Sequence, residues 1–421
     1  MGHAPGYRIS TVLFSDGERY PVLLNEAGAP EWLPSLYATS QLRNGGLAPS
    51  TVRASLDSIR LLFYWADGRG IRLEERFSQR KFLSENEARS LTNRLKSRAG
   101  PSPESGRPIV LSKHRHRVRA AIGAAEKQVD SQTSYSRITN VAAYLEWLAR
   151  YLMERDAKGL DASANADIEL MVTRLKSDRA IRRKSIEDAR EGLDASQQEK
   201  LEALSSTDGI SNPFEPAVRS RNALIVELLN LGVRAGELLS LKVSDFDLQA
   251  NTVRIDRRHG DSSDPRKNQP VVKTLDRLLP ITDDLAGQLT RYVMKERHSL
   301  MPARRHPFLL VTHKAGPFLG KPMSYKALAK LFTKLRSAAG GLLDGVSPHS
   351  LRHTANERMS EQMDAAGVSP AREEKMRSYT MGWQEGSGTA ATYTRRHTKR
   401  EAMKASLRMQ KARLKERGRE D

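Results

Sequence analysis

Residues 347–354 read Ser-Pro-His-Ser-Leu-Arg-His-Thr and carry the strongest local signal in this chain of 421 residues. Serine is a favoured N-cap and proline suits the first helical position, so Ser347 and Pro348 predict a helix start. Positions three and four apart share one helical face. The side chains on that face are His349, Arg352 and His353. The stretch therefore predicts two imidazoles and a guanidinium near a helix N-terminus, where backbone N–H groups favour an anion.

A second arginine motif lies upstream, where residues 232–239 read Gly-Val-Arg-Ala-Gly-Glu-Leu-Leu. The apolar run 224–229 predicts a buried helix that stops near Gly232, and a new helix is expected to open at Arg234. Glu237 follows Arg234 by three positions, so its carboxylate is well placed to orient a guanidinium or a histidine. Arginine suits phosphate because its planar fork holds two oxygens and stays protonated.

A late tyrosine completes the pattern, because Gly382-Trp383 is followed by Thr392-Tyr393-Thr394. Two arginines, a histidine and a late tyrosine in this order resemble the tyrosine recombinase (phage integrase) family. The resemblance covers residues 192–398 and implies a catalytic set of Arg234, Lys273, His349, Arg352, Trp383 and Tyr393. It also implies supporting roles for Glu237 and His353.

The resemblance assigns the nucleophile to Tyr393, which would form a 3′-phosphotyrosyl link to DNA and release a 5′-hydroxyl. A free phenol has a pKa near 10, so reaching the phenolate at pH 7 costs roughly 4 kcal/mol. Nearby arginines and a histidine acceptor can offset that cost. Tyr379 is the alternative nucleophile, but it precedes Gly382-Trp383, whereas the family's tyrosine follows that element. Bond energy is retained in the ester, so neither a metal nor another cofactor is expected.

Trp383 departs from the family's usual pattern, which has histidine after this glycine. Indole is only a hydrogen-bond donor, so Trp383 can hold a phosphate oxygen but cannot relay a proton. Any basic role therefore falls on His349.

The leaving 5′-hydroxyl needs a proton, which the family takes from a lysine on a β-hairpin. Residues 271–274 and 278–281 predict such a hairpin around Leu275-Asp276-Arg277. On this resemblance Lys273 is the proton donor, and Lys267, farther from the second strand, is the alternative.

The predicted fold is mainly α, with a small antiparallel β-sheet in the catalytic domain. An accessory segment with a β-hairpin around Asp16-Gly17 is expected in residues 1–45, because apolar residues alternate on both sides of that turn dipeptide. An α-helical core-binding domain, which would clamp DNA, is expected in residues 46–185, where apolar stripes mark helices at 52–63 and 138–152. A mixed α+β catalytic domain is expected in residues 186–398. A basic C-terminal helix in residues 399–421 is a candidate for docking into a neighbouring copy.

The charge balance favours a polyanionic partner, because 70 Lys and Arg against 50 Asp and Glu give a net charge of +20. Two basic runs are candidate DNA contacts, although a charge run is more usually a solvated face. They comprise Lys113, Arg115, Arg117 and Arg119, followed by Arg182, Arg183 and Lys184. The chain has no cysteine, which excludes thiolate nucleophiles and Cys-ligated zinc. No signal pattern or membrane-spanning apolar run is evident, so a cytoplasmic, nucleoid-associated protein is expected.

The expected function is a site-specific DNA recombinase that serves a mobile genetic element. It would act on double-stranded DNA as a homo-oligomer, normally a tetramer, with accessory DNA-bending or partner recombinase proteins as further candidates. A type IB topoisomerase would share the chemistry but religate the same strand. A catalytically idle DNA-binding protein with this fold and an RNA-binding protein are the alternatives from other classes. The low aromatic content of 6% argues against RNA binding, because it leaves few base-stacking platforms.

Overall fold

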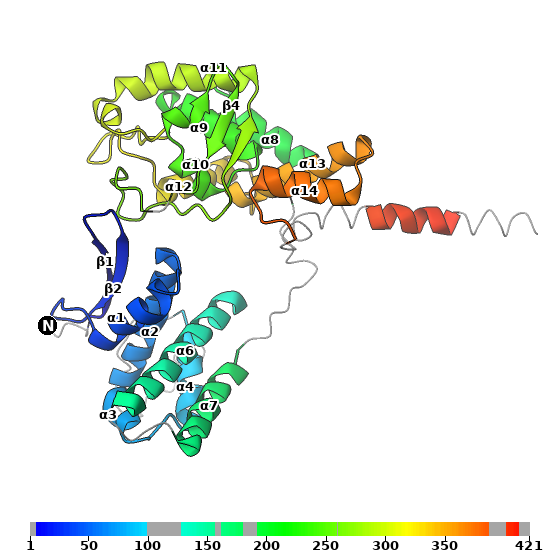
Figure 1. Cartoon of the computed structure of the whole chain (residues 1–421). Helices are drawn as coiled ribbons and strands as arrows, with labels where there is room; N and C mark the ends of the chain where they lie inside the picture. The colour runs from blue at the N-terminus through cyan, green and yellow to red at the C-terminus, as the bar shows by residue number, and fades with distance from the viewer. Residues whose placement is uncertain are drawn as a thin grey trace, which may run out of the picture. The chain divides into compact units, whose positions relative to one another are not determined.

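The computed structural model describes residues 6–98, 128–155, 161–179, 192–258, 260–386 and 401–411. The chain divides into two compact units, one formed by most of residues 1–183 and the other mainly by residues 184–421. The described parts are mainly helical with two small antiparallel sheets, which confirms the predicted fold class (Figure 1).

The first unit opens with a β-hairpin and continues in helices. The hairpin expected around Asp16-Gly17 is present, with Arg8 paired to Leu24 at its open end. Gly17 has a φ of 91°, a left-handed conformation that glycine adopts without a steric penalty. The elements of this unit are β1 (Arg8–Leu13), β2 (Arg19–Leu24), α1 (Trp32–Tyr37), the π-helix η1 (Ala38–Arg43), α2 (Pro49–Asp67), α3 (Leu73–Ser78), α4 (Glu85–Lys96), α6 (Ser131–Arg155) and α7 (Ala162–Ser177).

Helix α6 is the centre of this unit and packs against α2, α3, α4 and α7. The two apolar stripes predicted from sequence supply much of the core, since Leu56, Ile59, Ile138 and Leu145 are completely buried. Burying such a side chain contributes about 1.5–3 kcal/mol. Leu23 and Tyr37 join the same hydrophobic cluster, so the N-terminal segment shares the core of the helices.

The second unit surrounds a three-stranded antiparallel sheet with helices, and α9 lies within its hydrophobic core. Its first half consists of α8 (Ala195–Ser205), α9 (Pro216–Asn230), α10 (Ala235–Ser240), the 3-10 helix η2 (Val243–Asp245), β3 (Phe246–Asp247), β4 (Thr252–Ile255) and β5 (Arg277–Pro280). Its second half consists of α11 (Asp283–Arg291), the π-helix η3 (Tyr292–Arg297), the 3-10 helix η4 (Met301–Arg305), α12 (Tyr325–Ala338), α13 (Pro348–Ala365) and α14 (Pro370–Met381).

The hairpin predicted at 271–281 is wrong in its first strand. Strand β5 pairs with β4, where Ile255 lies opposite Arg277, across the long connection 256–276. Residues 271–274 form no strand, because their polar groups bind elsewhere. The Thr274 hydroxyl donates to Glu237, and the Leu275 N–H donates to the Gly382 carbonyl at 2.9 Å. Tertiary contacts thus override the β-propensity of the Val-Val-Lys-Thr stretch.

Residues 401–411 are helical, and almost all of their side chains are exposed. They include Met403, Leu407 and Met409, which are 62%, 55% and 74% exposed and so bury little apolar surface. In the parts of the chain that the structure describes, no helix is both long and apolar enough to cross a membrane.

Candidate active site

Helix α13 begins as predicted and fixes Arg352. Ser347 caps it, accepting a hydrogen bond from the Ser350 N–H, and Pro348 occupies its first position. Arg352 lies one turn further on and is completely buried. Its guanidinium donates to the Gly232 carbonyl and, at 2.7 Å, to the Met381 carbonyl. These two carbonyls, which come from separate segments, fix the plane of the guanidinium.

Arg234 is the N-cap residue of α10, immediately after the turn at Gly232. Gly232 has a φ of 83°, and this left-handed turn separates α9 from α10. The Arg234 N–H donates to Glu237 Oε2 at 2.8 Å, which satisfies one of the N–H groups that a helix start leaves free. Its guanidinium nitrogen Nη1 lies 3.7 Å from Glu237 Oε1. In the motif Gly-Val-Arg-Ala-Gly-Glu, one carboxylate therefore contacts both the backbone N–H and the guanidinium of Arg234.

Glu237 is the centre on which the arginines converge. Arg277 donates to Glu237 Oε2 at 2.8 Å, and Arg352 Nη1 lies 4.0 Å from the same oxygen. The Thr274 hydroxyl donates to Glu237 Oε1. The guanidinium groups of Arg234 and Arg352 are thus brought to one carboxylate, although 118 positions of sequence separate them.

The electrostatics of this cluster favour a further anion. Burial alone would raise the pKa of Glu237, but the hydrogen bond and charge of Arg277, the Thr274 hydroxyl and the charge of Arg352 hold this pKa below its usual range. Glu237 is therefore ionised at neutral pH. One carboxylate still faces three guanidinium groups, so the cluster keeps an excess of positive charge that suits a phosphate.

The three arginines differ in how far solvent reaches them. The side chain of Arg234 is 29% exposed, whereas those of Arg277 and Arg352 are 1% and 0% exposed. Arg234 is therefore the most accessible of the three guanidinium groups. The side chain of Arg352 is fully covered by protein.

His349 and His353 share helix α13 with Arg352, and Trp383 lies next to the Arg352 guanidinium. The rings of His349 and His353 lie edge to face with their centres 4.6 Å apart, and His353 is 5% exposed while His349 is half-buried. The guanidinium carbon of Arg352 lies 5.4 Å from the centre of the Trp383 ring. Trp383 follows Gly382, whose φ of 65° ends α14 in the left-handed conformation. The structure thus brings Arg234, His349, Arg352, Trp383, Glu237 and His353 into one region of the second unit.

Lys273 lies next to Thr274, on the connection 256–276 that contacts the arginine cluster. Its side chain is exposed, while its neighbours Val272 and Thr274 are buried, at 1% and 2% exposure. Because Thr274 is bound to Glu237, the backbone that carries Lys273 is tied to the arginine cluster. Lys267, the alternative, is exposed on the loop that precedes it.

The predicted nucleophile Tyr393 lies outside the described residues, and so do both predicted DNA-contact runs. These runs comprise Lys113, Arg115, Arg117, Arg119, Arg182, Arg183 and Lys184. The alternative nucleophile Tyr379 is described, and its side chain is 60% exposed on α14.

Sequence reasoning missed the role of Arg277, which had only been placed in the predicted hairpin. Arg277 also donates to the Thr380 carbonyl at 2.8 Å, so it links strand β5 and helix α14 to Glu237. The available signal was its position two residues before Leu279, because alternate residues of a strand share a face and an arginine on the buried face needs an anion.

Gly236 permits the connection 256–276 to cross α10 closely, and its substitution should disturb the cluster. A Cβ added to Gly236 would lie 2.4 Å from the Val271 carbonyl oxygen and 2.7 Å from the Tyr325 hydroxyl. Gly236→Ala should therefore destabilise the protein by about 1–3 kcal/mol, as overpacking generally does. Thermal unfolding measures this change.

A matched control is Gly287→Ala on α11. The nearest atom to its added Cβ is Arg291 Nη1 at 3.8 Å, so alanine fits. This variant should gain up to about 1 kcal/mol, because alanine is the better helix former. Equal stability of the two variants would contradict the close crossing of Val271 over α10.

Comparison with known proteins matches the second unit to one family. Residues 193–400 match the model of the phage integrase family. The tyrosine recombinase XerD of Mycobacterium leprae is 32% identical over 158 residues, which cover 37% of this chain and 44% of that protein. Transposase A from transposon Tn554 of Staphylococcus aureus is 28% identical over 151 residues, which cover 35% and 38%. The chain thus spans about half the length, or less, of these curated relatives.

Matches among solved structures include two recombinases bound to DNA. The XerH site-specific recombinase bound to palindromic difH substrate has a TM-score of 0.42 at 15% identity, covering 89% of this chain and 93% of that one. The Tn1549 transposon integrase in complex with circular intermediate DNA has a TM-score of 0.40 at 18% identity, covering 76% and 93%. On the family match and the relatives identified by sequence, the chain belongs to the tyrosine recombinase (phage integrase) family.

Proposed function

We propose that the protein is a site-specific DNA recombinase that cleaves and rejoins double-stranded DNA through a 3′-phosphotyrosyl intermediate. The observation that carries the proposal is the convergence of Arg234, Arg277 and Arg352 on Glu237. A single carboxylate leaves this cluster positive, and the N-termini of α10 and α13 carry two of its arginines. Fixed donors of this kind stabilise the charge that develops on phosphate oxygens during transfer.

The chemistry assigns a separate task to each group. The Tyr393 hydroxyl attacks the scissile phosphorus, and His349 accepts its proton. Arg234 and Arg352 hold the non-bridging oxygens, Arg352 after a movement that uncovers its buried guanidinium, and Trp383 supplies a further N–H. The bond from phosphorus to the 5′-oxygen breaks, and Lys273 protonates that oxygen. A 5′-hydroxyl from a partner duplex then attacks the phosphotyrosine, which restores the tyrosine and joins the strands.

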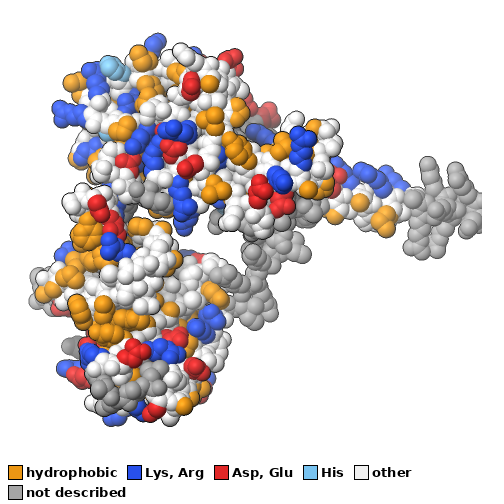
Figure 2. All heavy atoms as spheres, in the orientation of Figure 1, with side chains coloured by type: hydrophobic (Ala, Val, Ile, Leu, Met, Phe, Trp, Pro, Cys, Tyr) orange, Lys and Arg blue, Asp and Glu red, His pale blue; other side chains and the backbone are white. Residues whose placement is uncertain are grey.

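The same proposal includes the partners. On the face of the second unit visible in Figure 2, Lys and Arg side chains are interspersed with Asp and Glu, and the net charge of +20 of the whole chain suits a DNA backbone. Two duplexes held together need four copies, so a tetramer forms on DNA, with DNA-bending or partner recombinase proteins as candidate helpers. Service to a mobile element is supported by the similarity to a transposase. With DNA as its substrate, the protein acts on the bacterial nucleoid.

A randomised DNA library tests the function and finds the target sequence in the same experiment. The full chain is incubated with duplexes that carry a randomised core and one nick, so that a cleaved strand end diffuses away and the protein stays attached. Denaturation removes DNA that is bound non-covalently, and the attached strands are sequenced. One recurring sequence is expected. Attachment without sequence preference, together with relaxation of supercoiled DNA, would instead favour a type IB topoisomerase.

Lys273→Ala tests the proton donor. Cleavage of the recovered duplex should slow by about 10²–10⁴-fold, the usual contribution of a positioned general acid. A substrate with sulfur in place of the bridging 5′-oxygen should restore the rate, because a thiolate leaves without a proton. Single-turnover formation of the covalent adduct measures both effects.

Lys267→Ala is the matched control, since Lys267 is an exposed lysine of the same connection. It should cleave at close to the wild-type rate. If Lys267→Ala shows the slow, sulfur-rescued behaviour and Lys273→Ala does not, the proton donor is Lys267.

A further inference from the structure

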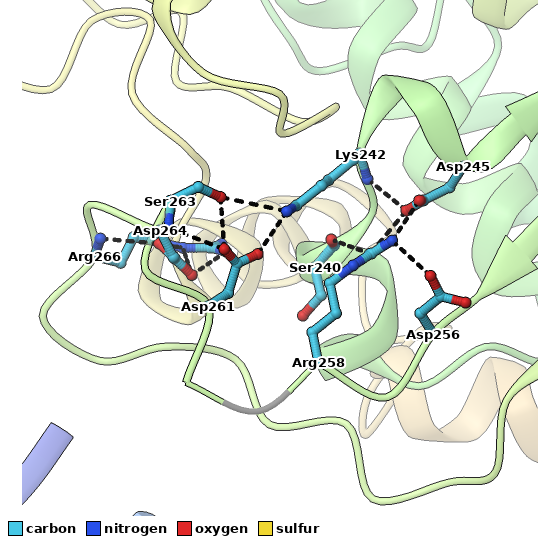
Figure 3. A network of polar contacts seen from close by, with 9 residues as sticks. All are labelled: Ser240, Lys242, Asp245, Asp256, Arg258, Asp261, Ser263, Asp264 and Arg266. Carbon is cyan, nitrogen blue, oxygen red and sulfur yellow. Dashed lines mark hydrogen bonds and ion pairs between the residues drawn. The ribbon is translucent and has the colours of Figure 1, made fainter. Parts of the chain in front are cut away.

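The connection between β4 and β5 is held by an internal network of charged side chains (Figure 3). Lys242 bonds Asp261 at 2.7 Å and Ser263 at 3.3 Å. Arg258 bonds both Asp245 and Asp256, the latter at 3.0 Å. We call this connection, residues 256–276, the brace. Residue 259 lies outside the described residues.

A second pair in the brace is more deeply buried. Arg266 bonds Asp264 through Nη2 at 2.8 Å and through Nε at 2.9 Å. The side chain of Arg266 is 9% exposed and that of Asp264 is 0% exposed. The guanidinium carbon of Arg266 also lies 4.8 Å from the centre of the Phe308 ring. A cation this deeply buried and paired is used inside the protein and is not offered to a DNA backbone.

The brace binds the C-terminal end of α10. Arg266 Nη1 donates to the Leu239 carbonyl at 2.9 Å and to the Met323 carbonyl at 2.7 Å. Arg258 Nη1 donates to the Ser240 carbonyl at 3.2 Å. Helix ends leave such carbonyls without partners inside the helix, and positive charge is favourable there.

The same brace binds the N-terminal end of α10. Thr274 donates to Glu237, and Val271 crosses over Gly236 so closely that a Cβ there would lie 2.4 Å from its carbonyl oxygen. A helix of six residues is not stable in water by itself and depends on its packing against the rest of the protein. The helix that follows Arg234 is therefore held at both ends by one segment, which also carries Lys273.

We infer that the brace is a positioning device for the phosphate site, and that Arg266 is its main positioning residue. Arg266 holds the far end of α10, so it sets where Arg234 meets the phosphate. It does not touch the reacting atoms. Because Lys273 belongs to the same segment, the proposed phosphate ligand Arg234 and the proposed proton donor Lys273 keep a fixed position relative to each other. This inference rests on the proposed function.

The test compares two variants with a control. Arg266→Lys keeps the positive charge beside Asp264 but lacks the planar fork that reaches two carbonyls. The double variant Asp264→Asn with Arg266→Met removes the pair together, so no unpaired buried charge remains if the first variant misfolds. Arg89→Met is the control, because Arg89 is a 66% exposed arginine whose ion pair to Glu85 lies within α4, away from the brace.

The measurements are the melting temperature, the affinity for the recovered duplex, and the single-turnover rate of adduct formation at saturating duplex. Arg266→Lys should form the adduct at least about tenfold more slowly, because small displacements of catalytic groups are costly. Its DNA affinity should stay near that of the control. The same comparison is repeated with a methylphosphonate at the scissile position, which removes the charge of one non-bridging oxygen. The difference between the rates of the variant and the wild type should then shrink, because a less charged phosphate depends less on the position of Arg234.

The outcomes separate this inference from the proposed function. A folded Arg266→Lys or double variant that forms the adduct at the control's rate overturns the positioning role. A loss of rate that is equally large on phosphate and methylphosphonate also overturns it, since a general structural defect would not depend on phosphate charge. If the wild-type protein forms no adduct on any duplex, the proposed function itself has failed.

Discussion

Tyr393→Phe should abolish the covalent adduct on a nicked duplex and leave retardation of the same duplex in a native gel nearly unchanged. Phenylalanine has the shape of tyrosine but no hydroxyl, so no phosphotyrosine can form. Binding should persist because it depends on many phosphate contacts spread over the protein. A denaturing gel measures the adduct, since only covalently attached DNA then migrates with the protein.

Tyr379→Phe is the matched control, and its result decides between the two tyrosines. Tyr379 is 60% exposed on α14, and its substitution should leave adduct formation intact. An adduct that persists in Tyr393→Phe and disappears in Tyr379→Phe would move the nucleophile to α14.

Arg234→Ala should reduce single-turnover cleavage by about 10²–10³-fold or more, the range seen when one fixed donor to a developing oxyanion is removed. The side chain is 29% exposed and its guanidinium lies 3.7 Å from Glu237, so its loss leaves little buried charge unpaired. The melting temperature should therefore change little. Stopped single-turnover reactions and thermal unfolding together measure this separation of chemistry from folding.

Arg277→Ala serves as the contrast, because it should lower the stability of the protein strongly, whereas Arg234→Ala should mainly lower the cleavage rate. Arg277 is buried and bonds Glu237 at 2.8 Å, so its removal takes the closest guanidinium from a buried carboxylate. Breaking such a pair costs about 3–5 kcal/mol of stability. An Arg234→Ala protein that cleaves at the wild-type rate would remove Arg234 from the phosphate site. One that unfolds like Arg277→Ala would make it a structural residue.

Much of the candidate site could be predicted because its signals are local. Ser347 and Pro348 mark the start of α13 within two residues, and the spacing of His349, Arg352 and His353 follows from helix geometry. The glycine turn before Arg234 is similarly local. The apolar stripes of α2 and α6 predict helices for the same reason, since the 3.6-residue period is visible within each segment.

The missed features depend on contacts between distant segments. Nothing near Thr274 in the sequence indicates that its hydroxyl binds Glu237, so the β-branched stretch before it predicts a strand that does not form. Arg277 meets a carboxylate 40 positions away and a carbonyl 103 positions away. The pairing of Arg266 with the end of α10 is likewise invisible in a loop that looks merely polar. Such partners are selected by the packing of the whole unit.

The central claim is that the fold gathers these side chains around one DNA phosphorus that Tyr393 attacks. Mapping the protein–DNA linkage tests it most directly. The wild-type protein is trapped on the nicked cognate duplex and digested, and the peptide that retains a nucleotide is sequenced by mass spectrometry. A single modified peptide is expected, with a phosphodiester of a DNA 3′ end on Tyr393. A linkage to any other residue, or no linked peptide on a duplex that the protein binds, would contradict the account.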